Sequence, residues 1–171
     1  MKIKNKKLKI KPEIRYLFDL KKVLYDKKWG KKAKNIPLYY VYRWVKEKNN
    51  LRYDVTIIPP RMLGKEFVKT KGHYHLGGYG EIYKVLKGEG IFLMQKKGGD
   101  IYYVKAKKGE YVLIPPSYGH TTINPFSKIL KMGNWAAKGC QYDYKSIERK
   151  KGFCYYYTKV GWMKNKDYKK I

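Results

Sequence analysis

Three histidines and one glutamate are the residues of this chain whose types and spacing fit metal chemistry. His73 and His75 are two residues apart, Glu81 opens the next apolar run, and His120 follows a Pro-Pro turn that resembles a second half-site. On a strand, alternate side chains point to the same face, so His73 and His75 can bind one metal ion. Glu81 can supply an oxygen ligand or a base. Such ligands suit iron, nickel, manganese, zinc or copper better than calcium or magnesium. His-x-His alone also fits two unrelated, partly buried histidines.

The elements that would position these side chains are strands. Residues 36–45 are aromatic and β-branched, and residues 51–58 form another such run that ends at Pro59 and Pro60. Shorter strands separated by glycine and proline turns are expected at 66–70, 81–86, 90–95, 101–106, 111–114, 120–124, 128–135 and 153–160. This spacing predicts an all-β sandwich or barrel, whose mouth can hold a metal and a ligand.

Little helix is expected in this chain. The N-terminal residues 1–11 form a basic arm, which we expect to be extended or a strand. A short helix or turn is expected to end within 23–26, and residues 27–35 have the composition of an exposed connection. No internal repeat or linker divides the 171 residues, so we expect one domain, 1–171, with its metal-site core at about 51–136.

The composition restricts the compartment and the partners. No apolar run is long enough for a membrane span, and no apolar segment follows the basic start, so we expect neither a membrane anchor nor a signal peptide. Two scattered cysteines, Cys140 and Cys154, indicate a reducing cytoplasm. The net charge of +28 would attract polyanions, but the lysine runs near the termini carry no base-reading motif. Nucleic acid is therefore not the expected partner.

Longer motifs give a family resemblance. The segment 72–88 with its two histidines, Glu81 and Gly88, and the segment 109–124 with its prolines and His120, resemble the two motifs of the cupin superfamily. The gap before Glu81 is slightly long, and Ser117 stands where a glycine is usual. The stretch from Gly64 to His75 and its surroundings further resemble the archaeal cupin-type glucose-6-phosphate isomerases, from about residue 14 to 153. This resemblance implies a cupin (double-stranded β-helix, or jelly-roll) barrel with N-terminal extension strands.

The resemblance also implies functional residues. The metal ligands of the family match His73, His75, Glu81 and His120, and residues of its sugar-phosphate pocket match Thr56, Thr70, Gly72, Tyr83, Tyr142 and Tyr144. Hydroxyls and a glycine amide can bind phosphate oxygens, although these threonines, the glycine and the tyrosine also fit ordinary strand, turn and core positions. Tyr142 replaces a histidine of the family, and the region near Trp135 lacks a tyrosine that the family carries.

The function that the resemblance implies is an aldose–ketose isomerase that interconverts glucose 6-phosphate and fructose 6-phosphate, in glycolysis and gluconeogenesis. Glu81 is the candidate base, beside one divalent transition metal, with iron expected first and nickel, manganese or zinc as alternatives. A homodimer is expected. The same four ligands also suit a dioxygenase, and a non-enzymatic binder of a sugar phosphate or another metabolite is a further alternative.

Overall fold

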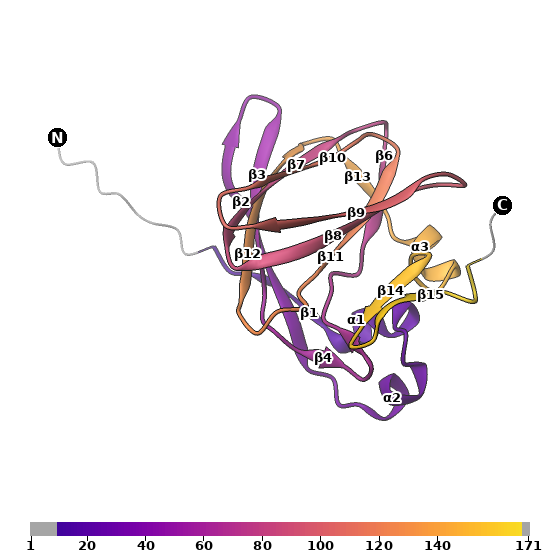
Figure 1. Ribbon diagram of the computed structural model, residues 1–171. Coiled ribbons are helices and arrows are strands. Elements are labelled where there is room, and N and C mark those ends of the chain that lie inside the picture. The colour runs from indigo at the N-terminus through magenta and orange to yellow at the C-terminus, as the bar shows by residue number, and fades with distance from the viewer. Residues whose placement is uncertain (1–9, 169–171) are drawn as a thin grey trace.

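The computed structural model describes residues 10–168, and these residues form mainly strands arranged in two facing sheets (Figure 1). The first sheet has the order β1–β2–β3–β12–β7–β10, with bounds Glu13–Tyr16, Pro37–Lys48, Leu51–Ile58, Leu130–Ala137, Glu81–Lys87 and Tyr111–Ile114. The second sheet has the order β13–β6–β11–β8–β9, with bounds Gln141–Asp143, His73–Leu76, Tyr118–Ile123, Glu89–Lys96 and Ile101–Lys107. Paired strands in both sheets are antiparallel, as in the predicted all-β barrel.

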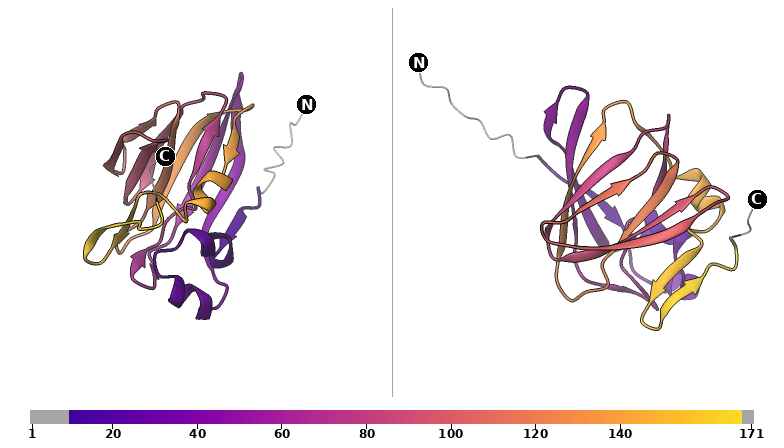
Figure 2. Two further views of the ribbon diagram at one scale, coloured as in Figure 1. Left: turned by 90° about the vertical axis from the view of Figure 1, so that its right-hand side faces the viewer. Right: turned by 45° about the horizontal axis from the view of Figure 1, so that its top comes forward.

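A third, smaller sheet and the helices close one end of this barrel, as the edge-on view in Figure 2 shows. The third sheet has the order β15–β14–β5–β4, with bounds Gly161–Lys164, Tyr155–Thr158, Glu66–Phe67 and Met62–Leu63. The helices are α1 at Leu17–Leu20, a 3₁₀ turn at Lys21–Val23, α2 at Lys27–Lys32 and α3 at Lys145–Arg149. None of the helices in the described part of the chain is long and apolar enough to cross a membrane.

The core lies between the two sheets and extends under the C-terminal segment. Strand β8 is buried over six consecutive residues. In a strand with one face toward solvent, every second side chain would be exposed, so both faces of β8 are covered. One of its faces meets the barrel interior, and the C-terminal segment covers the other, where Gln95 Oε1 accepts the backbone N–H of Cys154 at 2.8 Å. Strand β8, which pairs with the strand β11 that carries His120, is therefore packed on both faces.

The expected connection at residues 27–35 is wrong, because residues 27–32 form helix α2. Asp26 caps this helix by accepting the backbone N–H of Trp29 at 3.0 Å. Gly30 is buried in this helix. Any larger residue would crowd Leu24, because a Cβ at position 30 would lie 2.7 Å from Leu24 Cδ1. The lysine-rich composition of this segment did not indicate a helix, which the Asp26 cap and the close contact at Gly30 stabilise.

Most of the expected strands are confirmed within two or three residues, and two fall exactly on β3 and β10. The expected strand at 66–70 is wrong beyond residue 67, because β5 has only two residues. The strand expected at 153–160 is reduced to the four residues of β14. Strands β13 and β15 and helix α3 were not expected. Of the basic arm, residues 1–9 lie outside the described residues.

Candidate metal centre and ligand cavity

Both sheets contribute to the cluster of three histidines and one glutamate. His73 and His75 lie on β6, and His120 lies directly opposite His73 on the neighbouring strand β11. Glu81 begins β7 in the facing sheet and reaches across the barrel interior. One potential ligand atom from each residue lies within 4.8 Å of all the others. The strand alternation expected from the sequence therefore does bring His73 and His75 to one face.

The contacts within this cluster fit a bound cation better than a hydrogen-bonded network. The Nε2 atoms of His73 and His75 are 3.2 Å apart, and Glu81 Oε2 lies 3.3 Å from His75 Nε2 and 3.5 Å from His120 Nε2. Glu81 Oε2 is buried without a hydrogen-bond partner among the described residues. A buried carboxylate oxygen left in this way is costly, and a metal ion among these four atoms would satisfy it.

The protonation states also favour metal binding. The Nδ1–H of His75 donates to the carbonyl of Tyr79 at 3.1 Å, which leaves Nε2 as the ring nitrogen that faces the cluster. Burial and the neighbouring imidazoles hold the pKa of His73 well below its usual value. Burial also lowers the pKa of His120 to about 4, although Glu81 opposes this shift. Neutral imidazoles at neutral pH have the free lone pairs that a metal needs.

Two further residues contact the cluster, and one of them was missed in the sequence. Asn134, on β12, donates its side-chain N–H to Glu81 Oε1 at 2.5 Å. This contact holds one carboxylate oxygen and directs the other to the imidazoles. The hydroxyl of Tyr83 lies 3.1 Å from His120 Nε2. Burial raises the pKa of Tyr83 well above its usual value, as does the negative charge of Glu81, so its phenol stays protonated. A lone asparagine in a strand gives no sequence signal for such a role.

Burial and the neighbouring imidazoles act in opposite directions on the pKa of Glu81. Burial raises the pKa of this carboxyl group, whereas its contacts with the imidazoles of His75 and His120 lower it, and the net shift is downward. Glu81 is therefore ionised near neutral pH, as both a metal ligand and a general base require.

The cluster opens into a cavity that the predicted substrate residues line. The cavity wall includes all six of them: Thr56, Thr70, Gly72, Tyr83, Tyr142 and Tyr144. Residues that the sequence did not suggest also line it, among them Arg15, Tyr39, Arg43 and Asn134. Segments separated by more than a hundred residues thus converge on one site, with the metal cluster on one side and cationic side chains at the wall.

Two of the predicted substrate residues have clear structural roles as well. Gly72 has φ +77°, and a Cβ there would lie 2.4 Å from a ring carbon of Phe153 and 2.9 Å from the backbone oxygen of His120. Only glycine fits this turn into β6 without strain. The Thr70 hydroxyl accepts the backbone N–H of Thr122 at 3.0 Å. These roles neither require nor prevent contact with a ligand.

Tyr142, which we expect from the resemblance to stand in place of a histidine, packs edge-on against the ring of His73 with ring centroids 4.3 Å apart. Its strand β13 pairs with β6, which places Tyr142 opposite His75. The side chain of Arg52 donates to the Tyr142 hydroxyl. Because Arg52 is a donor only, the hydroxyl proton of Tyr142 stays available to another acceptor.

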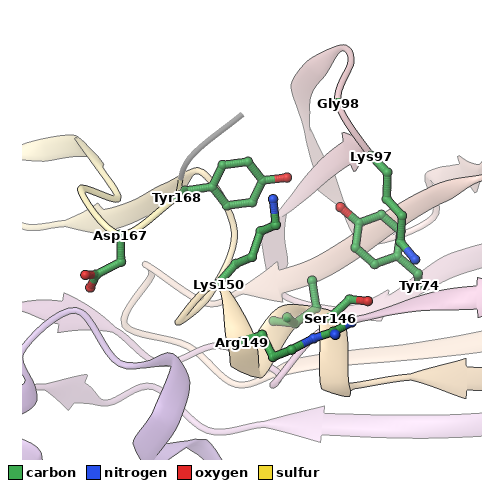
Figure 3. Close-up of a pocket in the computed structure, with 9 residues that line it drawn as sticks. Tyr74, Lys97, Gly98, Ser146, Arg149, Lys150, Asp167 and Tyr168 are labelled. Atoms are coloured by element: carbon green, nitrogen blue, oxygen red, sulfur yellow. The ribbon is translucent and has the colours of Figure 1, made fainter. Parts of the chain in front are cut away.

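A larger hollow lies on the other face of β6 (Figure 3). Tyr74 lies between the two histidines of β6, so its side chain points away from the metal cluster. Figure 3 shows Tyr74 and Lys97 on one side of this hollow and Lys150 and Tyr168 on the other. None of its lining residues belongs to the metal cluster, so size alone does not identify the candidate site.

Comparisons with known proteins agree with this geometry. A glucose-6-phosphate isomerase from Pyrococcus abyssi is 36% identical over 117 residues, which are 65% of this chain and 62% of that relative. A glucose-6-phosphate isomerase from Thermococcus onnurineus is 33% identical over 145 residues, covering 82% of this chain and 76% of the relative. The matched part of the chain thus spans less than two thirds of the Pyrococcus abyssi protein.

The structural comparison supports the fold alone. A solved oxalate oxidase superposes with a TM-score of 0.51 at 16% identity, over 61% of this chain and 54% of that protein. The fold is therefore that of the cupins. The family model for glucose-6-phosphate isomerase matches residues 16–171, which is nearly the whole chain. The chain belongs to the glucose-6-phosphate isomerase family.

Proposed function

We propose that this chain is a metal-dependent aldose–ketose isomerase that interconverts glucose 6-phosphate and fructose 6-phosphate, a step of glycolysis and gluconeogenesis. The observation that supports this most is the convergence of the His/Glu cluster and the six predicted substrate residues on one cavity. Family membership supports the same substrate pair.

One divalent transition metal per chain would be held by His73, His75, Glu81 and His120. Iron is the first candidate, with nickel, manganese or zinc as alternatives, because all accept imidazole and carboxylate ligands. When bound, such an ion supplies Lewis-acid stabilisation of the negative charge that develops on the sugar oxygens.

Glu81 is the residue that we propose moves the proton. Isomerisation transfers a hydrogen between C2 of the open-chain aldose and C1 of the ketose through an enediolate. In the aldose-to-ketose direction, the Glu81 carboxylate removes the proton from C2 and returns it to C1, while the proton of the O2 hydroxyl passes to O1. Asn134 fixes its Oε1, so Oε2 is the oxygen oriented toward the interior. The protonated phenol of Tyr83 can donate to a sugar oxygen as its charge increases.

The phosphate group would be held at the threonine side of the cavity. Thr56 and Thr70 supply hydroxyls, and Gly72 lets a ligand approach the backbone closely. Tyr142 and Tyr144 close the far side. The enclosed position next to the metal cluster would shield the enediolate from water.

The test is turnover of fructose 6-phosphate by the purified protein, before and after a chelator, with iron, nickel, manganese and zinc added back separately. We expect activity to disappear on chelation and to return with at least one divalent metal. A metal-loaded protein that turns over no sugar phosphate would contradict the isomerase and leave a cupin with another activity, such as a dioxygenase or a metabolite binder.

We also propose a cytoplasmic homodimer. The outer face of the six-stranded sheet exposes Ile82, Tyr111 and Leu113, whose exposed fractions are 40%, 61% and 63%. Ile82 and Leu113 are direct partners on β7 and β10, so they form one apolar surface that a second copy can cover. No disulfide joins Cys140 and Cys154, both of them buried, within the described structure. Size-exclusion chromatography with light scattering should give twice the mass of one chain. The mass of a single chain would contradict the homodimer.

A further inference from the structure

Arg43 continues the alternation by which Tyr39 and Val41 of strand β2 also line the cavity, and the strand is distorted directly after Tyr42. Tyr42 of β2 pairs with Val55 of β3, but the next paired residues are Lys46 and Tyr53. Three residues of β2 therefore lie opposite the single residue between Val55 and Tyr53, which makes a bulge with two extra residues. Trp44 within it has φ 57°, a conformation that non-glycine residues rarely adopt. Bulges of this kind redirect side chains and are frequent beside functional sites.

Asp54 is the residue that fills the bulge. Its Oδ1 accepts the backbone N–H of Trp44 at 3.0 Å, and its Oδ2 lies 2.8 Å from Arg43 Nη1. Arg52 Nε approaches the same Oδ2 at 3.2 Å. The Asp54 side chain is 1% exposed, so its charge requires these partners. The result is a guanidinium group held in place at the cavity wall instead of a freely rotating surface arginine.

The charges around this bulge leave an excess of positive charge. Arg15 and Arg43 both line the cavity, and Arg52 lies behind them. The carboxylates that contact them are Glu13 and Asp54. Three cations against two anions leave one positive charge at this wall.

Asp54 and Thr56 are two residues apart on β3, so their side chains are on the same face of the sheet. Val41 pairs with Thr56, and Arg43 lies two residues beyond Val41, so Arg43 and Thr56 belong to the same cavity wall. Neutral hydroxyls can accept and donate hydrogen bonds to a phosphate, but they cannot balance its charge. A guanidinium group does both and matches the geometry of phosphate oxygens.

We propose that Arg43 is a substrate-binding residue that recognises the phosphate group of the sugar phosphate, with Asp54 and Arg52 as positioning residues. The ligand class rests on the proposed function. Arg52 has a second positioning contact, because it also donates to the Tyr142 hydroxyl on the far side of the cavity. The Asp54 contacts in the bulge of β2 and the contact between Arg52 and Tyr142 therefore connect two walls of the cavity.

The test compares R43Q, R43K and the control R61Q in the metal-loaded protein. Arg61 is exposed and does not line the cavity, so R61Q removes the same charge from the protein without changing the site. Calorimetry measures the dissociation constants for fructose 6-phosphate and inorganic phosphate, and a coupled assay measures KM and kcat. Circular dichroism and thermal unfolding establish that each variant is folded.

We expect R43Q to weaken the binding of both ligands by about tenfold to a hundredfold, as the loss of a charge-assisted hydrogen bond does. KM should rise more than kcat falls, R43K should be intermediate, and R61Q should match the unmodified protein. Equal affinities in R43Q and R61Q would overturn the role of Arg43 even if turnover is normal. Weaker binding in R43Q without turnover in any protein would support Arg43 and contradict the isomerase. A protein that binds neither ligand would contradict both.

Discussion

Replacing Asn134 by alanine removes the amide that holds Glu81 in place. Asn134 is 4% exposed and donates to Glu81 Oε1 at 2.5 Å. A hydrogen bond to a charged group contributes about 1.5–3 kcal/mol, which corresponds to about tenfold to a hundredfold in an equilibrium constant. Loss of a residue that orients a metal ligand typically has an effect of this size on metal affinity or activity. N134A should therefore weaken metal binding by about tenfold to a hundredfold.

The assay is competition between the protein and a chromophoric chelator for one divalent metal. The control is N165A, because Asn165 is also buried, at 2% exposure, and donates to the backbone oxygens of Lys150 and Phe153 outside the metal cluster. N165A should lower the thermal unfolding midpoint while its metal affinity stays within about twofold of the unmodified protein. Metal affinity in N134A equal to that in N165A would refute the argument that Asn134 orients Glu81.

The other predictions concern the surroundings of the site. G72A should lower stability by about 1–3 kcal/mol in denaturant unfolding, because the φ of +77° disfavours alanine and its Cβ would lie 2.4 Å from the Phe153 ring; unchanged stability would contradict this. K69M should cost about 3–5 kcal/mol, because Glu66, 0% exposed, loses the cation 2.5 Å away, and a loss below about 1 kcal/mol would be inconsistent with that ion pair. Burial alone would raise the pKa of Asp143, but hydrogen bonds from α3 and a nearby lysine outweigh it and lower the pKa to about 2. Its folded pKa is depressed, so its contribution to stability is complete above about pH 4 and is lost as the pH falls toward about 2. The difference in unfolding midpoint between the unmodified protein and D143N should shrink over that window, and a constant difference would be contrary to this assignment.

The strand pattern and the metal cluster could be predicted because both depend on local spacing. Alternation places His73 and His75 on one face wherever the strand lies, and glycine and proline turns limit the strands around them. The cross-barrel contacts of Glu81 and His120 were accessible only through the family resemblance. Nothing in the sequence itself states that β7 faces β6 and β11.

The parts that were not predicted depend on pairing and capping. Helix α2 was hidden because a single cap at Asp26 outweighs a lysine-rich composition. Arg43 and Asn134 were missed because their roles arise from the register of β2, β3 and β12, which is set by the whole sheet. The bulge near Trp44 carries neither a glycine nor a proline that would indicate it. Such features become visible only when the partner strands are known.

The measurement that tests the central claim most directly is turnover of fructose 6-phosphate in D₂O by the metal-reconstituted protein, with the product followed by NMR at low conversion. If Glu81 carries the hydrogen as a proton, the carboxyl group exchanges with solvent and deuterium should appear at C2 of glucose 6-phosphate. Turnover that yields unlabelled product would contradict transfer through a Glu81 carboxyl group that exchanges with solvent during the reaction. The absence of any turnover would contradict the isomerase itself.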